Sequence, residues 1–325
     1  MANFVGIVVG FLNVYIIRLV AFSLPPRYPL NATWRKNTTD FDWNEMLKVL
    51  APAKINLFLR VLRKRADGYH DIASVMQKIS LYDELAFSLR SEGISLNCPN
   101  SNLPAAEDNL VFRAARAIFS YTGYQSGVEI TLIKNIPTAA GLGGGSSDAA
   151  TTLLALNEIC GLGLKKSDLM KLGVKIGADV PFFIFGNCAY AGGIGDKLKT
   201  LKNIPKVNVV LINPQFSLST KMVYEKLNLR LTKERINYSI PRFFAVGDII
   251  REMHNDLETV SLKIHPELND LKDILLRQGA RGAMMSGSGP TVFGIFTDEN
   301  SAKKAVEAIN KEVSQRCLVF FAHSL

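Results

Sequence analysis

The 325-residue sequence has few of the residues that build metal or disulfide sites. Its four cysteines are Cys98, Cys160, Cys188 and Cys317, and no two of them form a C-x-x-C pair. The four histidines are scattered, with no H-x-x-x-H pair. These absences argue against a zinc or dithiol redox motif. We therefore expect buried or free thiols in a reducing compartment.

The sequence also lacks a long basic run, although its formal net charge is +9. The densest basic cluster is RVLRKR at residues 60–65. An excess of positive charge can attract nucleic acid, an anionic membrane surface or a phosphorylated small molecule. Without a basic stripe, bulk charge alone is weak support for nucleic-acid binding. We expect a small-molecule substrate, no nucleic-acid partner and no obligate protein partner.

The first 45 residues differ from the rest of the chain. Their apolar part extends to residue 24, but its longest charge-free stretch, residues 1–17, is shorter than the roughly 20 residues that span a membrane. No basic residues precede it, as they would in a signal peptide. We interpret residues 1–45 as an extension outside the fold, for which a misassigned start is one explanation. A membrane anchor at residues 5–24 is the alternative to the expected cytoplasmic location.

Strand and helix patterns are mixed from Met46 onwards, which predicts an α+β fold with a boundary near residue 205. The predicted units are residues 46–205 and 206–325. Alternation at Ile55, Leu57, Leu59 and Val61 predicts a strand, with Lys54 and Asn56 on its opposite face. Helical spacing predicts a helix within residues 107–123 that ends at Gly123, and a short helix with Ser167 as its N-cap that ends at about Ile176.

A glycine-rich stretch, PTAAGLGGGSS, lies between a predicted strand and a predicted helix. It could be a flexible linker, a tight turn without a ligand, or an anion cradle whose free N–H groups and helix N-terminus face a phosphate. The stretch is too short for a linker. It is not a Walker A loop, because no Gly-Lys-[Ser/Thr] follows, and it does not fit G-x-G-x-x-G.

Four segments resemble known motifs in the same order along the chain. PTAAGLGGGSSDAA resembles the ATP-binding motif of the GHMP kinases. Residues 51–75, with DGYH, and residues 177–186, with GADVP, resemble the 4-diphosphocytidyl-2-C-methyl-D-erythritol kinases within that family. SGSGPTVFGIF at residues 286–296 resembles the C-terminal glycine motif. The resemblance covers about residues 48–322.

The resemblance implies a ribosomal-protein-S5-like N-terminal domain that binds ATP and a ferredoxin-like C-terminal domain. It implies ATP-dependent phosphorylation of a hydroxyl of a methylerythritol unit in the non-mevalonate isoprenoid pathway, with a cytidine diphosphate group as the recognition handle. The ATP site is carried over residue by residue. It comprises Pro137, Thr138, Ala139, Ala140, Gly141, Leu142, Gly143, Gly144, Gly145, Ser146 and Ser147.

The same resemblance assigns Asp179 as general base and Lys54 as the lysine that holds the hydroxyl and stabilises negative charge. A hydroxyl is a poor nucleophile at neutral pH, so a nearby carboxylate and a cation are the groups that this chemistry needs. The structural alternatives are a helix N-cap for Asp179, ahead of Pro181, and a solvated lysine on a strand face for Lys54.

The remaining matches concern the acceptor. Tyr69 and His70 match positions that stack on or hydrogen-bond cytosine, and an ordinary hairpin with one packed aromatic is the alternative. Asn56 matches a polar substrate contact, and Tyr224 falls roughly where the family places an aromatic on the other side of the base. Gly287, Ser288 and Gly289 are expected near the phosphates or the substrate tail, although a strand-entry turn would also explain them.

Magnesium is expected with ATP, and its protein ligands are unknown beyond a hydroxyl of Ser146 or Ser147. Two other functions remain open. Another GHMP kinase, such as a homoserine or mevalonate kinase, would have no base to stack, so DGYH argues against it. A non-catalytic nucleotide-binding protein on the same fold would not need Lys54 and Asp179.

Overall fold

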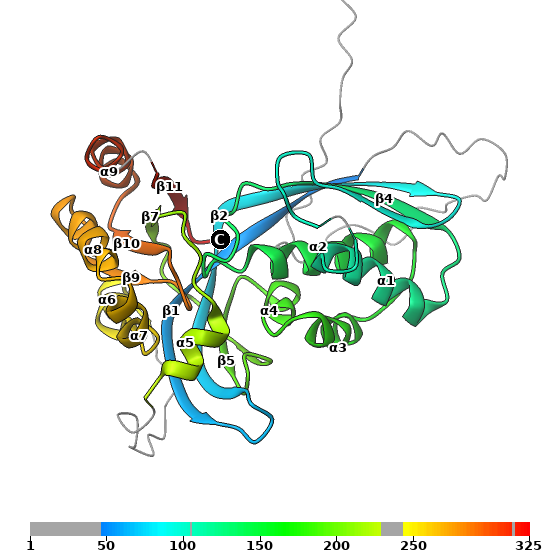
Figure 1. The fold of residues 1–325 in the computed structure, drawn as a ribbon, viewed down its shortest axis with the longest axis horizontal. Coiled ribbons are helices and arrows are strands. Elements are labelled where there is room, and N and C mark those ends of the chain that lie inside the picture. The colour runs from blue at the N-terminus through cyan, green and yellow to red at the C-terminus, as the bar shows by residue number, and fades with distance from the viewer. Residues whose placement is uncertain (1–46, 105, 229–242, 314–315) are drawn as a thin grey trace, which may run out of the picture.

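The computed structural model describes residues 47–104, 106–228, 243–313 and 316–325 (Figure 1). The expected extension at residues 1–45 lies outside these residues. Within the described ranges, no helix is long and apolar enough to cross a membrane.

The first half of the fold is a sheet built on one long antiparallel hairpin. β1 (Leu47–Lys64) pairs with β2 (His70–Arg90) along almost its whole length. The sheet order is β3-β4-β2-β1-β8, and β5 pairs with both β2 and β6. The shorter strands are β3 (Ile94–Asn97), β4 (Gly127–Ile133), β5 (Cys188–Gly192), β6 (Lys197–Thr200) and β8 (His254–Asn255).

Four helices form a layer on this sheet, on the side seen to the right in Figure 1. They are α1 (Leu110–Thr122), α2 (Gly144–Ile159), α3 (Lys166–Ile176) and α4 (Val180–Phe185). In this layer α1, α2 and α4 contact the strands, and α3 packs on the other three helices. α1 begins with an N-cap bond from Val111 N–H to the Asn109 side chain and ends at Gly123 in the left-handed conformation, as predicted. The N-cap of α3 is Lys165, two residues before the predicted Ser167, so Ser167 lies inside the helix.

The second half of the fold is a four-stranded antiparallel sheet of order β11-β7-β10-β9. In chain order these strands form a β-α-β-β-α-β arrangement, which is the predicted ferredoxin-like topology. The strands are β7 (Asn208–Asn213), β9 (Gly282–Met285), β10 (Val292–Phe296) and β11 (Leu318–His323). The helices are α5 (Thr220–Lys226), α6 (Val246–Glu252), α7 (Glu258–Ile264), α8 (Glu267–Arg277) and α9 (Glu299–Glu312).

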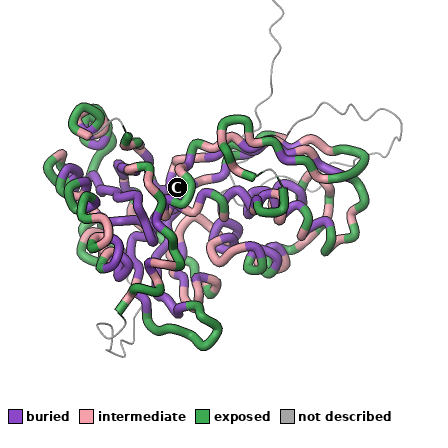
Figure 2. The backbone as a smooth tube through the Cα atoms, in the orientation of Figure 1, coloured by how far each residue is buried: buried purple, intermediate pink, exposed green. Residues whose placement is uncertain are grey.

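The middle of β1 is buried on both faces, which corrects the expected half-exposed strand. Ile55 and Leu57 pack with Leu211 and Phe293 of the second sheet in one hydrophobic core. The opposite face is covered by the helical layer, so even Lys54 is only 4% exposed. Figure 2 shows this buried band where the two halves of the fold meet. A strand shared by two layers has no solvent face, and its polar residues must find partners inside.

The chain passes from the first sheet to the second between β6 and β7, close to the predicted boundary at residue 205. β8 then returns to the first sheet, where it pairs in parallel with β1 at Phe58 and Leu59. The two halves also share the core described above. The division into units 46–205 and 206–325 stays a prediction.

Candidate active site

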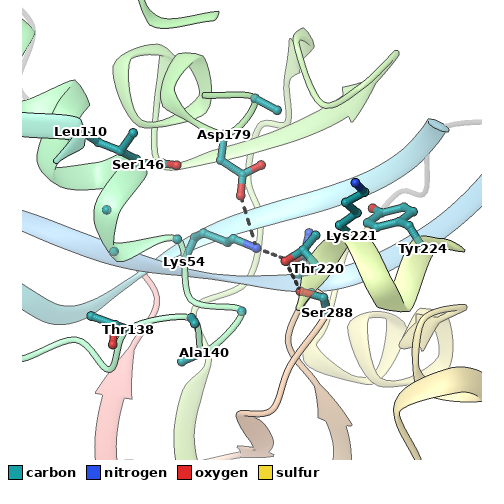
Figure 3. A pocket seen from close by; sticks show the side chains of 18 of the residues that line it. Lys54, Leu110, Thr138, Ala140, Ser146, Asp179, Thr220, Lys221, Tyr224 and Ser288 are labelled. Carbon is teal, nitrogen blue, oxygen red and sulfur yellow. Dashed lines mark hydrogen bonds and ion pairs between the residues drawn. The ribbon is translucent and has the colours of Figure 1, made fainter. Parts of the chain in front are cut away.

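A cavity of about 970 Å³ opens between the two halves of the fold. Its walls come from the glycine-rich loop before α2, from the β1–β2 hairpin, from the start of α4, from α5 and from the loop between β9 and β10. Figure 3 shows Lys54 and Asp179 pointing toward each other across it. Segments more than 100 residues apart in the sequence therefore meet at one site.

The two glycine-rich loops contact each other directly. The Ser286 hydroxyl donates to the Gly141 carbonyl oxygen at 3.0 Å, and the Thr291 N–H donates to the Ala140 carbonyl at 3.3 Å. Gly141 has a φ of +77°, and a Cβ built on it would lie 2.0 Å from the Ser286 carbonyl oxygen. This contact requires glycine, because a side chain would collide with backbone rather than with a flexible group.

Lys54 is held in place by a chain of hydrogen bonds rather than by solvent. Its Nζ donates to Asn56 Oδ1 at 2.6 Å, and Asn56 Nδ2 donates to Ser74 Oγ at 2.8 Å. Burial lowers the pKa of Lys54 below its ordinary value, and the nearby Asp179 carboxylate partly opposes this shift. The surface-lysine alternative is wrong. Both the oxygen and the nitrogen of the Asn56 amide are hydrogen-bonded inside the protein, so this side chain positions Lys54. The predicted contact between Asn56 and the substrate stays a prediction.

Asp179 immediately precedes α4 but does not cap that helix with its side chain. Its Oδ2 instead lies 3.7 Å from Lys54 Nζ, and its side chain is 30% exposed. Gly195 lies on its other side, where an added Cβ would be 3.8 Å from Asp179 Oδ1. The alternative in which the Asp179 side chain caps the N-terminus of α4 is therefore wrong. The carboxylate is left facing the cavity, where it can accept a proton from a bound hydroxyl.

The turn of the β1–β2 hairpin brings aromatic groups to another part of the cavity wall. Tyr69 is 58% exposed, whereas His70 is buried beside Tyr224, with ring centroids 5.1 Å apart. These two rings approach each other too closely to enclose a base between them. Burial, with a contribution from Lys64, holds the pKa of His70 below its ordinary value, so it is neutral near pH 7. Burial raises the pKa of Tyr224, so its hydroxyl keeps its proton.

Most of the residues predicted for the site line this one cavity, including Lys54, Asp179, Tyr69, His70 and Tyr224. Three predicted residues do not. Leu142 is fully buried in the core, and Ser147 lies inside the first turn of α2 with its N–H bonded to the Gly143 carbonyl. Gly289 packs behind the loop, where an added Cβ would lie 2.4 Å from Met285 Sδ. Of the two serines proposed to contribute a hydroxyl, only Ser146 lines the cavity.

Sequence patterns missed several other residues of the cavity. Thr220 at the start of α5 shares a hydrogen bond of 2.8 Å with Ser288, which joins the α5 wall to the second glycine loop. An apolar recess is lined by Leu103, Leu110 and Leu132. Outside the cavity wall, Asn255 donates to the carbonyls of Met285 and Gly287 and so fixes that loop from behind. Leu110 lies in the predicted helix 107–123, but the sequence patterns assigned it no role in the site. For Thr220 and Asn255 no local signal exists.

Comparison with known proteins assigns the chain to a family. The model of the GHMP kinase N-terminal domain matches residues 109–187, and the model of the GHMP kinase C-terminal domain matches residues 241–315. A protein from Syntrophus aciditrophicus, named 4-diphosphocytidyl-2-C-methyl-D-erythritol kinase, is 60% identical over 82% of this chain and 95% of its own length. The chain belongs to the GHMP kinases.

Solved structures agree with this GHMP kinase assignment. The crystal structure of a 4-(cytidine 5'-diphospho)-2C-methyl-D-erythritol kinase is 34% identical, with a TM-score of 0.72, and the match covers 86% of this chain and 99% of that one. A homoserine kinase from Cytophaga hutchinsonii, 22% identical with a TM-score of 0.67, covers 89% of this chain and 97% of its own, and shows the shared fold alone. The predicted family and its two-part fold are confirmed.

Proposed function

We propose that this GHMP kinase transfers the γ-phosphoryl group of ATP to a hydroxyl of 4-diphosphocytidyl-2-C-methyl-D-erythritol, giving the 2-phosphate and ADP, in the non-mevalonate isoprenoid pathway. The observation that carries this proposal is the Lys54–Asp179 pair, 3.7 Å apart in a cavity that the glycine-rich loop and the Tyr69–His70 turn both line. The names of the relatives at up to 60% identity support the choice of acceptor.

In the proposed reaction, Asp179 accepts the proton of the attacking hydroxyl while the hydroxyl oxygen attacks the γ-phosphorus and the bond to the β-phosphate oxygen breaks. Lys54 lies where its ammonium can hold that oxygen beside Asp179 and stabilise the transferring group. The Asn56–Ser74 hydrogen bonds fix the lysine before substrate arrives. Preorganised groups of this kind contribute more to catalysis than groups that must be ordered during the reaction.

ATP is proposed to bind along the glycine-rich loop, with its phosphates against Gly141 and Gly143 and its adenine toward the apolar recess. The loop lies directly before α2, whose N-terminus carries about half a positive charge. A magnesium ion bound with ATP would neutralise phosphate charge, and the Ser146 hydroxyl is an oxygen group of the cavity wall that would suit it.

The cytosine of the acceptor is proposed to bind at the hairpin turn. A neutral His70 can both donate to and accept from the polar edge of a base. Tyr69 offers an exposed ring for stacking. Tyr224 packs on His70 here, so its predicted place on the other side of the base would require its ring, or that of His70, to move.

Phosphoryl transfer by the purified full-length chain tests this function. The panel holds 4-diphosphocytidyl-2-C-methyl-D-erythritol, homoserine and mevalonate, each with ATP and magnesium. We expect turnover of the cytidyl compound alone. Turnover of homoserine or mevalonate instead would support the proposed kinase activity but would show that the proposed acceptor is wrong. ATP binding without turnover of any compound would favour a non-catalytic nucleotide-binding protein.

Tyr69→Ala should raise KM for the cytidyl acceptor by about 5- to 160-fold, because stacking on a base is worth roughly 1–3 kcal/mol. KM for ATP should stay unchanged. Tyr121→Ala is the matched control, because Tyr121 is 57% exposed on α1 and does not line the cavity. Steady-state kinetics with each substrate varied in turn gives the result, and equal acceptor KM values in both variants would contradict the stacking role.

A further inference from the structure

Lys78 on β2 is a buried lysine that the proposed reaction does not use. It is only 8% exposed. In the register of the β1–β2 hairpin it lies opposite Lys54, so the two side chains leave the same face of the sheet. A buried charge is costly unless it is paired, and an opposite charge is the usual partner. Lys78 instead bonds to a backbone carbonyl.

That carbonyl belongs to α4, the helix that follows Asp179. Lys78 Nζ donates to the Phe183 carbonyl oxygen at 2.9 Å and lies 5.9 Å from the centre of the Phe183 ring. The Lys78 backbone N–H also donates to the Asn187 carbonyl oxygen at 2.8 Å, just after the helix. The side chain and the backbone of Lys78 therefore both hold the C-terminal end of α4 on β2.

Lys54 and Lys78 contact α4 one turn apart. Lys54 Nζ lies 3.7 Å from Asp179 Oδ2 at the start of the helix, and Lys78 contacts Phe183 four residues later. The backbone of Asp179 is in the helical region, with φ −86° and ψ −13°, so helical spacing applies to it. Residues four apart lie on the same face of a helix, about 6 Å from each other along its axis. Two such contacts define both the place of α4 on the sheet and its rotation.

α4 is too short to hold its own position. It has six residues, and isolated helices of fewer than about 12 residues are marginal in water. Val180 and Phe182 are fully buried and keep the helix on the core. Apolar contacts are non-directional, however, whereas a hydrogen bond depends on both distance and angle. A directional contact is therefore needed to set where the helix rests.

The protein keeps the charge of Lys78 at a cost in free energy. Burial lowers the pKa of Lys78 to about 8, and the nearby Lys166 ammonium acts in the same direction. Lys166 contacts the Phe185 carbonyl oxygen, so two ammonium groups lie at the C-terminal end of α4. An apolar residue in place of Lys78 would avoid the cost of burying a charge. Costly groups of this kind are concentrated at functional sites.

We propose that Lys78 is a positioning residue whose bond to the Phe183 carbonyl places α4 so that the Asp179 carboxylate lies beside Lys54 and the attacking hydroxyl. The inference rests on the proposed function. Lys78 does not line the cavity, so it acts on the reaction through Asp179 rather than by touching a substrate. Because catalysis depends steeply on the position of the base, a small displacement of α4 should lower the rate and leave both binding sites intact.

Steady-state kinetics of Lys78→Met tests this role. Methionine keeps an unbranched apolar side chain against the Phe183 ring but has no donor for the carbonyl. With ATP and 4-diphosphocytidyl-2-C-methyl-D-erythritol, kcat should fall by about 10- to 100-fold, and both KM values should stay within about threefold of wild type. Lys171→Met is the matched control, because the Lys171 side chain is 77% exposed on α3, and it should keep the wild-type kcat. A wild-type kcat in folded Lys78→Met, or a loss that appears only in KM, would overturn the positioning role.

A double-mutant cycle with Asp179→Asn tests whether Lys78 acts through Asp179. Once the carboxylate is gone, its position no longer matters, so Lys78→Met should lower kcat further by less than about threefold. The same large loss in both backgrounds would show that Lys78 affects activity by another route, and the inference would then be wrong.

Lys78→Gln provides a second variant if Lys78→Met does not fold by circular dichroism. The glutamine amide can still donate to the Phe183 carbonyl, but its nitrogen is one bond closer to the backbone than the lysine ammonium, so α4 should rest in a shifted position. We expect kcat to fall at least about threefold, but less than in Lys78→Met where that variant folds, with both KM values unchanged. A wild-type kcat in Lys78→Gln would contradict the dependence on position.

Crystal structures of wild type and of the folded variant separate this inference from the proposed function. The distance between Lys54 Nζ and the Asp179 carboxylate can be compared whatever the acceptor is. We expect it to increase from 3.7 Å to beyond about 4 Å, the limit of an ion pair. An unchanged distance would overturn the positioning role, whereas a wild-type protein that phosphorylates no acceptor would overturn the proposed function.

Discussion

Asp179→Asn is expected to lower kcat by about 10²–10⁴-fold, because an amide cannot accept the proton of the attacking hydroxyl. The change is nearly isosteric, and the Asp179 side chain makes no capping hydrogen bond that the fold would lose. KM for ATP and for the acceptor should change little. Measuring kcat and both KM values, together with ATP binding by calorimetry, separates a loss of chemistry from a loss of substrate.

The control for this variant is Asp168→Asn. Asp168 forms an exposed ion pair with Lys171 at 3.2 Å on α3, and pairs of this kind contribute about 0–1 kcal/mol. Its kcat should equal that of wild type. If Asp179→Asn kept a kcat within threefold of wild type while binding both substrates, Asp179 would not be the base.

Gly141→Ala should destabilise the chain by about 2–4 kcal/mol and raise KM for ATP. The substitution combines a left-handed φ of +77° with a Cβ only 2.0 Å from the Ser286 carbonyl oxygen. Backbone strain of this kind and forced repacking each cost about 1–3 kcal/mol. Relief requires the two glycine loops to separate, and this would move Gly141 away from its proposed place against the phosphates. Thermal and denaturant unfolding measure the first effect, and steady-state kinetics the second.

Gly123→Ala separates conformational strain from collision. Gly123 has a φ of +70°, similar to that of Gly141, but a Cβ built on it meets nothing within 4 Å. Only the strain should remain, at a cost of about 1–2 kcal/mol, with no change in KM. Equal losses of stability in the two variants would show that the contact between the loops is not tightly packed.

Much of the fold could be predicted from local patterns. Apolar alternation located β1, helical spacing and Gly123 located α1, and the order of strands and helices gave an α+β fold. These features depend on neighbours in the chain. The N-cap of α3 was predicted two residues late, because Ser167 is a preferred capping residue whereas the helix begins after Lys165, which caps it without a side-chain hydrogen bond.

The site was only partly predictable. Motif matches selected the glycine-rich loop, Lys54 and Asp179, and the structure brings all three to one cavity. The roles of Leu142 and Ser147 could not be assigned from their place in the motif, because whether a loop side chain faces a cavity or the core depends on the backbone path. Thr220 and Asn255 stand in no motif that was recognised, and their contacts join segments more than 30 residues apart.

The sequence by itself determined the family, the order of the elements and the identity of the two residues proposed for chemistry, because each depends on residue type at close spacing. Only the tertiary structure decided that Lys54 is buried and fixed by Asn56, that Asp179 faces Lys54 instead of capping α4, and that the two glycine loops touch. It also decided that Lys78 lies beside Lys54 and contacts Phe183 of α4. These facts depend on which faces of distant segments are pressed together, and the burial that results sets the partners and pKa values of charged groups.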